Sequence, residues 1–512
     1  MLAKVFSHEV YGVDAFTVEV EVDVTKGKDV FNIVGLPDAS VKESKERVKA
    51  ALINSNFYCP REQITINLAP ADMRKKGPSL DLPMALGLLG ALGKINPERL
   101  RQFSIVGELS LDGAIRPVAG ALPIALGARD KGFSGIIVPA ENAAEAAVVE
   151  GIDVFPVSTL MDAVSFLNSQ MEIAPHRANL REIFVCNSKC FLDFADVKGQ
   201  ENAKRALEIA AAGGHNVLLV GPPGSGKTML AKRLPSILPE LSLEESVETT
   251  KLHSIAGLLN GKQSLIATRP FRSPHHTISN IALIGGGTIP KPGEVSLAHN
   301  GVLFLDEMPE FDRQVLEVLR QPLEDGYVNI SRTAMSLTFP ARFILCGSCN
   351  PCYCGYLTDT TRECRCTPQQ IQKYRNRLSG PLLDRIDLHI EVSAVPIREL
   401  ARHSHAAEPS SAIRERVNAA RQRQRERYAD ISGVHSNAHL SSREMKKFCR
   451  LTEAAQTTLE SAMYMLGLSA RAYDRIIKVA RTIADMTGQD QIDTDQVAEA
   501  IGYRSMDRNV WK

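Results

Sequence analysis

The sequence predicts an α/β protein of several domains that ends in a mostly helical region. Strand-like and helical patterns alternate over residues 1–168 and again over residues 191–396, whereas residues 397–512 become helical in pattern after a polar stretch. Residues 169–190 lose this periodicity and are expected to form a linker. A chain of 512 residues is also too long for a single core, since domains average about 150 residues.

The N-terminal domain, residues 1–168, carries its own strand and helix signals. Residues 18–24 alternate valine with acidic residues, which predicts a half-buried strand. Residues 40–54 suit a helix, and residues 64–68 suit a second strand. Residues 80–92 predict an apolar helix rich in Ala and Leu, so we expect an α/β domain with a separate core.

The composition is that of an ordinary globular protein, with 44% hydrophobic and 23% charged residues. Sixty Lys and Arg balance 59 Asp and Glu, so any nucleic-acid surface must be a local patch. The sequence has no export signal and no stretch of the ~20 apolar residues that cross a bilayer. We therefore expect a cytoplasmic protein without a membrane partner, in which clustered cysteines indicate a metal site before a disulfide.

An apolar strand followed by a glycine-rich turn predicts a nucleotide site in the central domain. Residues 217–220 (VLLV) lead into the pattern G-x-x-x-x-G-K-[ST], and a helical segment follows. The motif consists of Gly221, Pro222, Pro223, Gly224, Ser225, Gly226, Lys227 and Thr228. Such loops surround phosphates with backbone N–H groups, so we expect ATP here, with Lys227 on its β- and γ-phosphates and Thr228 on Mg²⁺. The alternative, a chance glycine-rich turn, leaves the flanking strand and helix unexplained.

Two further apolar strands end in polar residues of the kinds that ATP hydrolysis uses. Residues 302–305 precede Asp306, which fits a Mg²⁺ ligand, and Glu307, which fits the base that orients the attacking water. Residues 343–349 precede Asn350, a candidate for holding that water near the γ-phosphate. The alternative for Asn350 is an amide that begins a turn before Pro351.

Arg385 lies in the run LLDRID and is a candidate arginine finger, which would reach the γ-phosphate of a neighbouring subunit. Taken alone, an Arg beside Asp384 and Asp387 is better interpreted as one half of a surface ion pair. The neighbouring residues by themselves favour the ion pair, whereas the family that the surrounding motifs resemble favours the finger.

The strand series, Asn350, Arg385 and the helical C-terminal region together resemble the AAA+ superfamily. Residues 269–276 (RPFRSPHH), 285–287 (GGG) and 292–301 (PGEVSLAHNG), ahead of the acidic strand, resemble the magnesium-chelatase-like ATPases. Within these, nearly the whole chain resembles the ComM/YifB family. The resemblance implies a central AAA+ domain over residues 191–396 and a C-terminal helical lid over residues 397–512.

The same resemblance assigns roles to individual residues. Lys227, Thr228, Asp306 and Glu307 fall on the Walker positions, Asn350 on sensor 1 and Arg385 on the arginine finger. Arg471, in the run LSARA, resembles sensor 2 and would contact the γ-phosphate; the alternative is a surface Arg on a helix. An arginine supplied by a neighbour favours a ring, and the family implies a hexamer.

Residues 326–339 predict two short strands around a turn, which resembles the pore hairpin of ring helicases. Arg332 would then follow a nucleic-acid backbone without reading bases; the alternative is a solvated hairpin Arg.

Residues 412–428 carry six arginines, but Glu415 and Glu426 dilute their charge and favour a solvated helix face over a phosphate-binding one.

Four cysteines within fifteen residues, Cys352, Cys354, Cys364 and Cys366, predict a structural Zn²⁺ site. The alternative is four reduced thiols on an ordered loop, because C-x-C spacing is less usual than C-x-x-C.

Residues 77–92, 106–113 and 137–142 resemble the S5-type proteolytic domain of Lon, with Ser79 on the nucleophile position. The matching Lys should lie near residues 120–124 (GALPI), where there is none. A Ser without a base is a poor nucleophile, so we expect a Lon-like fold without peptidase activity.

The resemblance implies an ATP-dependent DNA motor acting on single-stranded or branched DNA. It would drive branch migration in the homologous recombination of incoming DNA during natural transformation. One alternative is a chelatase-like ATPase that remodels proteins or handles metal, and a less favoured one is an ATP-dependent peptidase that uses Ser79.

Overall fold

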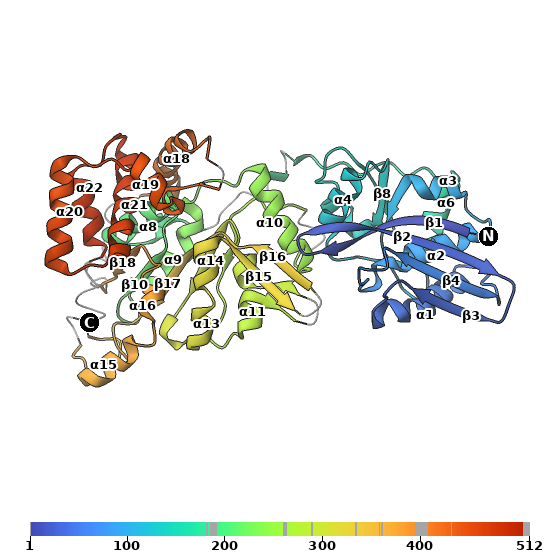
Figure 1. The fold of residues 1–512 in the computed structure, drawn as a ribbon, viewed down its shortest axis with the longest axis horizontal. Coiled ribbons are helices and arrows are strands. Elements are labelled where there is room, and N and C mark those ends of the chain that lie inside the picture. Colours follow the sequence, from blue (N-terminus) through green and yellow to red (C-terminus); the bar gives the residue numbers. More distant parts are fainter. Residues whose placement is uncertain are drawn as a thin grey trace. The chain divides into compact units, whose positions relative to one another are not determined.

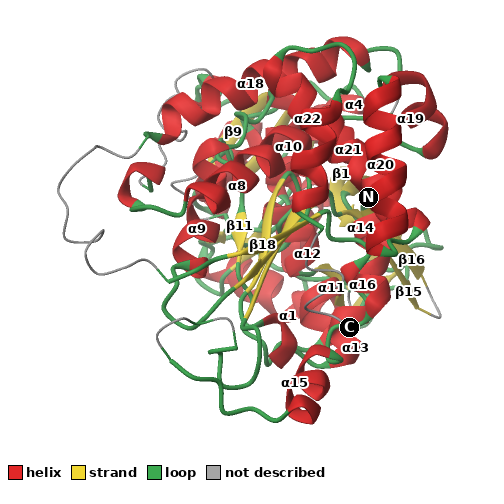
Figure 2. Cartoon of the chain, turned by 90° about the vertical axis from the view of Figure 1, so that its left-hand side faces the viewer, coloured by secondary structure: helices red, strands yellow, loops and turns green. Residues whose placement is uncertain are grey.

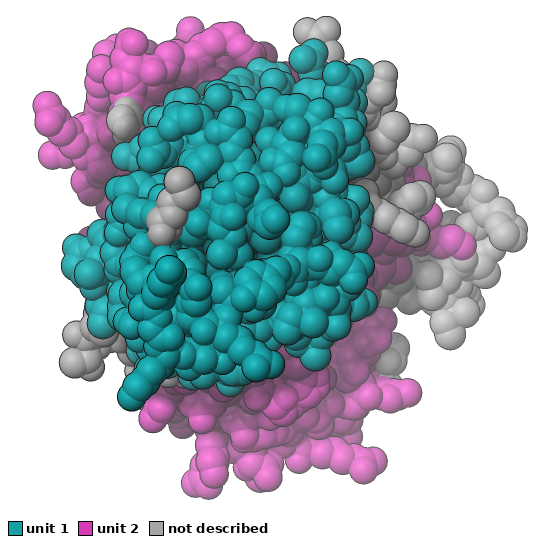
Figure 3. Space-filling view, turned by 90° about the vertical axis from the view of Figure 1, so that its right-hand side faces the viewer, with its two compact units in different colours: residues 1–187, 243–267, 331–338 teal, residues 188–242, 268–330, 339–512 magenta. Residues whose placement is uncertain are grey.

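The computed structural model describes residues 2–504, apart from several short stretches. The stretches outside the description are 181–182, 185–191, 260–263, 288–289, 333–334, 358, 360–361, 395–407 and 432. The chain divides into two compact units, which Figure 3 colours separately. Unit 1 comprises Met1–Asn187, Leu243–Ala267 and Ser331–Thr338; unit 2 comprises Ser188–Ser242, Thr268–Ile330 and Phe339–Lys512.

Unit 1 is built on a mixed sheet that has seven strands within the described residues. In spatial order they are β3 (Val30–Val34), β4 (Gln63–Ala69), β2 (Asp14–Thr25), β1 (Leu2–Tyr11), β5 (Phe103–Ile105), β8 (Gly135–Pro139) and β9 (Asp153–Val157). The strand predicted over residues 18–24 is confirmed inside β2, where Val18, Val20 and Val22 are fully buried. Alternation placed these valines on the core face because successive side chains of a strand point to opposite sides.

The helices of unit 1 pack on this sheet or, in the case of the last of them, on another of these helices. They are α1 (Ala39–Asn54), α2 (Asp81–Ala91), α3 (Pro97–Gln102), α4 (Ala121–Asp130), α5 (Ala143–Ala146), α6 (Leu160–Leu167) and α10 (Leu243–Ile255). The apolar helix α2 is buried along its whole length, and a Cβ at Gly87 would lie 2.7 Å from Val22 Cγ2. Glycine therefore lets α2 lie directly on the sheet. The buried carboxylate of Asp81, at its start, is neutralised by Arg47 of α1 at 2.7 Å.

Helix α10 joins unit 1, although it lies inside the range that the sequence assigns to the central domain. The hydroxyl of Ser254, in α10, donates to the buried carboxylate of Glu145, and the Ser254 carbonyl accepts from Gly120 N–H at 3.2 Å. Burial raises the pKa of Glu145, and the hydrogen bonds that its carboxylate accepts from the Ser254 hydroxyl and the Leu122 N–H oppose that shift. Such pairings between distant segments are invisible to local sequence patterns.

Unit 2 contains a parallel sheet of five strands within the described residues. Their order is β11 (Phe271–Arg272), β14 (Gly301–Leu305), β17 (Phe343–Cys349), β10 (Val217–Val220) and β18 (Leu388–Glu391). All neighbouring pairs are parallel, and Val220 is in register with Cys349. The carboxyl ends of β10, β14 and β17 consequently share one edge, where open α/β sheets bind their ligands.

The helices of unit 2 lie around this sheet and continue into the C-terminal region (Figures 1 and 2). The longer ones are α8 (Glu201–Gly213), α9 (Lys227–Ile237), α18 (Ser410–Arg427), α20 (Glu453–Leu466), α21 (Ala470–Thr487) and α22 (Thr494–Gly502). Their apolar faces form one core with the strands, which confirms the predicted α/β architecture with a helical end. In the described part of the chain, no helix is both long and apolar enough to cross a membrane.

Several arginines of α18 form ion pairs and hydrogen bonds with the neighbouring helices of unit 2. Arg416 pairs with Glu208 of α8 at 2.6 Å, and Arg427 pairs with the fully buried Asp485 of α21. Arg421 donates to the Ala211 carbonyl at 3.2 Å. The expectation of a merely solvated face is therefore incomplete, because α18 packs between α8 and α21 and its arginines reach acceptors on both.

Replacing Asp485 by Ala is expected to lower the free energy of unfolding by about 3–5 kcal/mol, because Arg427 and Arg481 would lose their buried counter-charge. Chemical denaturation followed by circular dichroism measures the loss. Asp430→Ala removes an exposed carboxylate from the loop after α18 and should change stability by less than about 0.5 kcal/mol. Equal stability of the two variants would contradict this account of the C-terminal helices.

Candidate nucleotide site

The phosphate-loop motif follows the buried strand β10, and its last two residues, Lys227 and Thr228, begin α9. Gly224 and Gly226 have φ of +78° and +91°, which side-chain-bearing residues rarely adopt. At Gly221 a Cβ would lie 2.1 Å from the Val392 carbonyl oxygen, so glycine is required by space as well. The first-turn N–H groups of α9 have no acceptor within the helix, and this loop holds them at a site suited to anions.

Lys227 is folded back onto the loop. Its Nζ donates to the carbonyls of Gly221 at 2.7 Å and Pro222 at 2.9 Å, and to Asn350 Oδ1 at 3.2 Å. Burial lowers the pKa of Lys227, and the nearby carboxylates of Asp306 and Glu307 oppose that shift. The structure thus brings together Lys227 and Asn350, two predicted site residues 123 positions apart in the chain.

Asp306 connects the loop to the neighbouring strands. Thr228 Oγ1 donates to one carboxylate oxygen at 2.8 Å, and Ser348, in β17, donates to the other. The Glu307 N–H also bonds this carboxylate, at 3.1 Å. A hydroxyl and a carboxylate side by side are hard oxygen donors that fit Mg²⁺, which usually takes few protein ligands together with phosphates.

Ser348 was missed by the sequence analysis. The available signal was a polar residue one position before the end of an otherwise apolar strand. It is fully buried, and its hydroxyl fixes the carboxylate that Thr228 also contacts. The Ser348 hydroxyl also lies 3.3 Å from the N–H of Glu307, an exposed residue whose backbone is left-handed with φ of +50°.

The two arginines expected to contact nucleotide lie on carboxylates of their own chain. Arg385 is 6% exposed; it donates to Glu324 and, at 2.5 Å, to the Pro381 carbonyl. Arg471 pairs with Asp384 at 3.3 Å. No contact between described residues joins either arginine to the phosphate loop, so their roles at the γ-phosphate stay predictions. The ion pair considered for Arg385 is present, but with Glu324.

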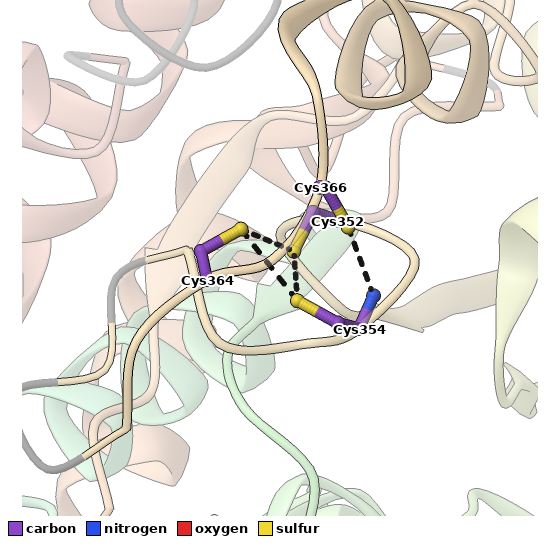
Figure 4. A group of neighbouring side chains, drawn as sticks. All are labelled: Cys352, Cys354, Cys364 and Cys366. Carbon is purple, nitrogen blue, oxygen red and sulfur yellow. Dashed lines mark hydrogen bonds between the residues drawn. The ribbon is translucent and has the colours of Figure 1, made fainter.

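The four clustered cysteines converge (Figure 4). Their sulfur atoms lie within 4.8 Å of one another, and Cys352, Cys354 and Cys364 are separated by 3.4–3.7 Å. Tetrahedral Zn²⁺ with Zn–S bonds of about 2.3 Å requires similar sulfur separations of about 3.8 Å. Burial acts to raise the pKa of Cys354, but backbone N–H groups of Tyr356 and Arg365 outweigh it and lower that pKa to about 6. The cluster is therefore compatible with Zn²⁺.

The remaining candidates lie elsewhere. The backbone of Arg332 ends β15 (Tyr327–Arg332), but its side chain and the turn at residues 333–334 fall outside the described residues. Ser79 lies in a short 3-10 helix, Pro78–Leu80. Within the described part of unit 1, no hydrogen bond joins its hydroxyl to a lysine, and the expected lack of peptidase activity stays a prediction.

Family models support a common ancestry with magnesium chelatase. The model "Magnesium chelatase, subunit ChlI" matches residues 193–400, "Subunit ChlI of Mg-chelatase" matches 20–142, and the ChlI C-terminal model matches 407–504. Competence protein ComM of Haemophilus influenzae is 47% identical over 516 residues, covering 100% of this chain and 99% of that protein. The chain belongs to the ComM/YifB family.

Other relatives agree with this membership. Uncharacterized protein YifB of Salmonella typhimurium is 44% identical over 99% of this chain and 98% of its own length. Magnesium-chelatase subunit ChlI of Chlorella vulgaris is 24% identical over 60% of this chain and 86% of its length. The ComM/YifB family is a magnesium-chelatase-like AAA+ family, which implies an ATPase with ATP and Mg²⁺ as cofactors. The Lon-like character of the N-terminal region stays a prediction.

Two substitutions should separate ATP binding from hydrolysis. Lys227→Ala removes the buried ammonium and is expected to weaken ATP binding and reduce turnover by about 100-fold or more. Glu307→Gln keeps the loop and should retain ATP affinity while losing turnover by about 10²–10⁴-fold. Fluorescent-nucleotide binding and phosphate release measure the two effects.

Lys232→Ala, on the exposed side of α9, is the matched control and should behave like the wild type. Undiminished turnover in Lys227→Ala would remove the phosphate-loop assignment, and rapid turnover in Glu307→Gln would remove the assignment of the base.

Proposed function

We propose that this chain is an ATP-driven DNA motor that promotes branch migration when incoming DNA recombines with the chromosome in natural transformation. The observation that carries the proposal is 47% identity over the whole chain to Competence protein ComM, supported by the contacts of Lys227 with Asn350 and of Thr228 with Asp306 at one sheet edge. The cytoplasm is the compartment that this activity requires.

The chemistry would divide among residues already close together. Lys227 would exchange the Gly221 and Pro222 carbonyls for phosphate oxygens, aided by the N-terminus of α9. Thr228 and Asp306 would hold Mg²⁺, which neutralises phosphate charge when it is bound. Glu307 would orient the attacking water, and Asn350, beside Lys227, would hold that water near the γ-phosphate.

Self-association would complete the site. Arg385 lies two residues after α16 (Gly380–Leu383). Within one chain, its guanidinium group forms an ion pair with Glu324. An arginine supplied by the next subunit would make hydrolysis depend on assembly, which favours a ring and, from the family, a hexamer. Arg471 would act in its own subunit once it leaves Asp384.

DNA contact would involve the hairpin of β15 and β16 (Met335–Pro340). If Arg332 follows the phosphate backbone, Arg332→Ala should weaken binding of single-stranded and forked DNA equally across sequences. The salt dependence should fall by about 0.7 in log–log slope, as for one lost phosphate contact. Fluorescence anisotropy at several salt concentrations measures both, with Arg443→Ala, an exposed arginine of α19 (Ser442–Phe448), as the control.

The rival function is a protein- or metal-handling remodeller, as the chelatase models would allow. Forked DNA should stimulate ATP turnover by a motor and leave a remodeller unaffected. Absence of both DNA binding and stimulation in the wild type would favour the remodeller, and a base-selective loss in Arg332→Ala would contradict backbone tracking.

We also propose a structural Zn²⁺ ion held by Cys352, Cys354, Cys364 and Cys366. Protein purified without chelators should contain about one zinc per chain by mass spectrometry of the metal, since four thiolates complete a tetrahedral site. Cys364→Ser should lose it, whereas Cys59→Ser, in unit 1, should keep it. A wild-type chain free of zinc would leave the reduced-thiol alternative.

A further inference from the structure

A hollow separate from the phosphate loop lies between two segments of unit 2. Its volume is about 680 Å³, and one wall is α15 (Pro368–Arg375) with the residues that follow it. The other wall comprises the 3-10 helix η4 (Met308–Glu310) and the start of α13 (Arg313–Glu317). We call this hollow the α15 groove.

The α15 wall presents a polar face to the groove. Gln369, Gln372, Lys373 and Asn376 follow the i, i+3, i+4, i+7 spacing that brings side chains onto one side of a helix, and all four are exposed lining residues. Tyr374, off that face, is 4% exposed and anchors the helix. The groove wall is thus a fixed helix that offers three amides and an ammonium group.

The charge of the groove is positive. Glu310 is the one carboxylate among its lining residues, and Arg377 neutralises it at 2.7 Å. Among the described residues, neither Arg313 nor Lys373 lies within ion-pair distance of a carboxylate; Glu317 feels the charge of Arg313 but pairs with Arg320 at 2.9 Å. Two cations therefore remain available beside hydrogen-bonding amides, the side-chain types that proteins use to contact phosphodiester oxygens.

The one aromatic side chain among the lining residues is buried, which favours recognition of a nucleic-acid backbone over recognition of bases. Phe311, the aromatic lining residue, is only 4% exposed, so it provides no open ring on which a base could stack. A ligand here would be held through its charge and its oxygen atoms, with little dependence on sequence.

The groove is connected to both neighbouring sites. The helix η4 begins directly after Glu307, and Arg377 donates to the Pro309 carbonyl at 3.2 Å as well as to Glu310. At the other end, α15 starts from a capping box on Thr367, the residue after Cys366. A strand lying in the groove would thus press on the segment that carries the catalytic carboxylate, while the cysteine cluster would hold α15 in place.

We infer that the α15 groove binds the phosphate backbone of single-stranded DNA and transmits its occupancy to Glu307 through η4. This inference rests on the proposed DNA-motor function and adds a second contact to the one assigned to Arg332. It also gives the cysteine cluster a purpose, since an ordered α15 is needed to form the groove.

The test uses the full chain with a fluorescein-labelled oligothymidylate. Lys373→Glu and Arg313→Glu are each expected to weaken binding about tenfold at low salt and to reduce the salt dependence, because each replaces a phosphate contact with a repelling charge. Stimulation of ATP turnover by the oligonucleotide should fall in parallel. Lys446→Glu, on the exposed surface of α19, makes the same charge change and should leave binding and stimulation unaltered. Thermal unfolding of each variant checks that it is folded.

The outcomes separate two failures. If the wild type does not bind the oligonucleotide, the proposed function and the groove fail together. If the wild type binds and both groove variants bind equally well, only the groove is overturned. A loss in Lys446→Glu as large as in Lys373→Glu would also overturn it, because the effect would then follow net charge and not position.

Discussion

The carboxylate of Asp306 is the point on which the nucleotide site depends. It accepts hydrogen bonds from Thr228, at the start of α9, and from Ser348, near the end of β17. Because β14, β17 and β10 are adjacent in the sheet, this single acidic group connects the phosphate loop with the ends of β14 and β17. Without this carboxylate, Thr228, proposed to bind Mg²⁺, and Glu307, proposed as the base, would lose the hydrogen-bond acceptor that they share.

The ammonium group of Lys227 is buried, which costs it most of its hydration. Lys227 is 8% exposed, and an ammonium in such a place needs several acceptors to offset desolvation. Two loop carbonyls and Asn350 supply them. A phosphate would offer stronger, charged acceptors to the same ammonium group.

The C-terminal helices are tied to the segment that carries Arg385. Arg471 of α21 pairs with Asp384, and Arg475 lies 3.2 Å from the buried carboxylate of Asp387. His215, before β10, bonds both Asp387 and Thr482 of α21. Burial acts to raise the pKa of Asp387, but Arg475 and His215 outweigh it and hold that pKa below its usual range. Movement of α21 would therefore affect the residues on both sides of Arg385.

Local patterns were enough to predict the α/β class, the phosphate loop and the acidic strand. Each depends on residues adjacent in sequence: alternating valines specify a strand face, and glycines at fixed spacing permit a turn around phosphates. They were also enough to group the four cysteines, which lie within fifteen residues. The tertiary structure alone decided that Ser348 supports Asp306, that Glu324 holds Arg385, and that α10 packs with unit 1. It likewise decided that α15 faces η4 across a positive groove. Those pairings join residues tens of positions or more apart, and only the folded sheet and its helices bring them within hydrogen-bonding or packing distance.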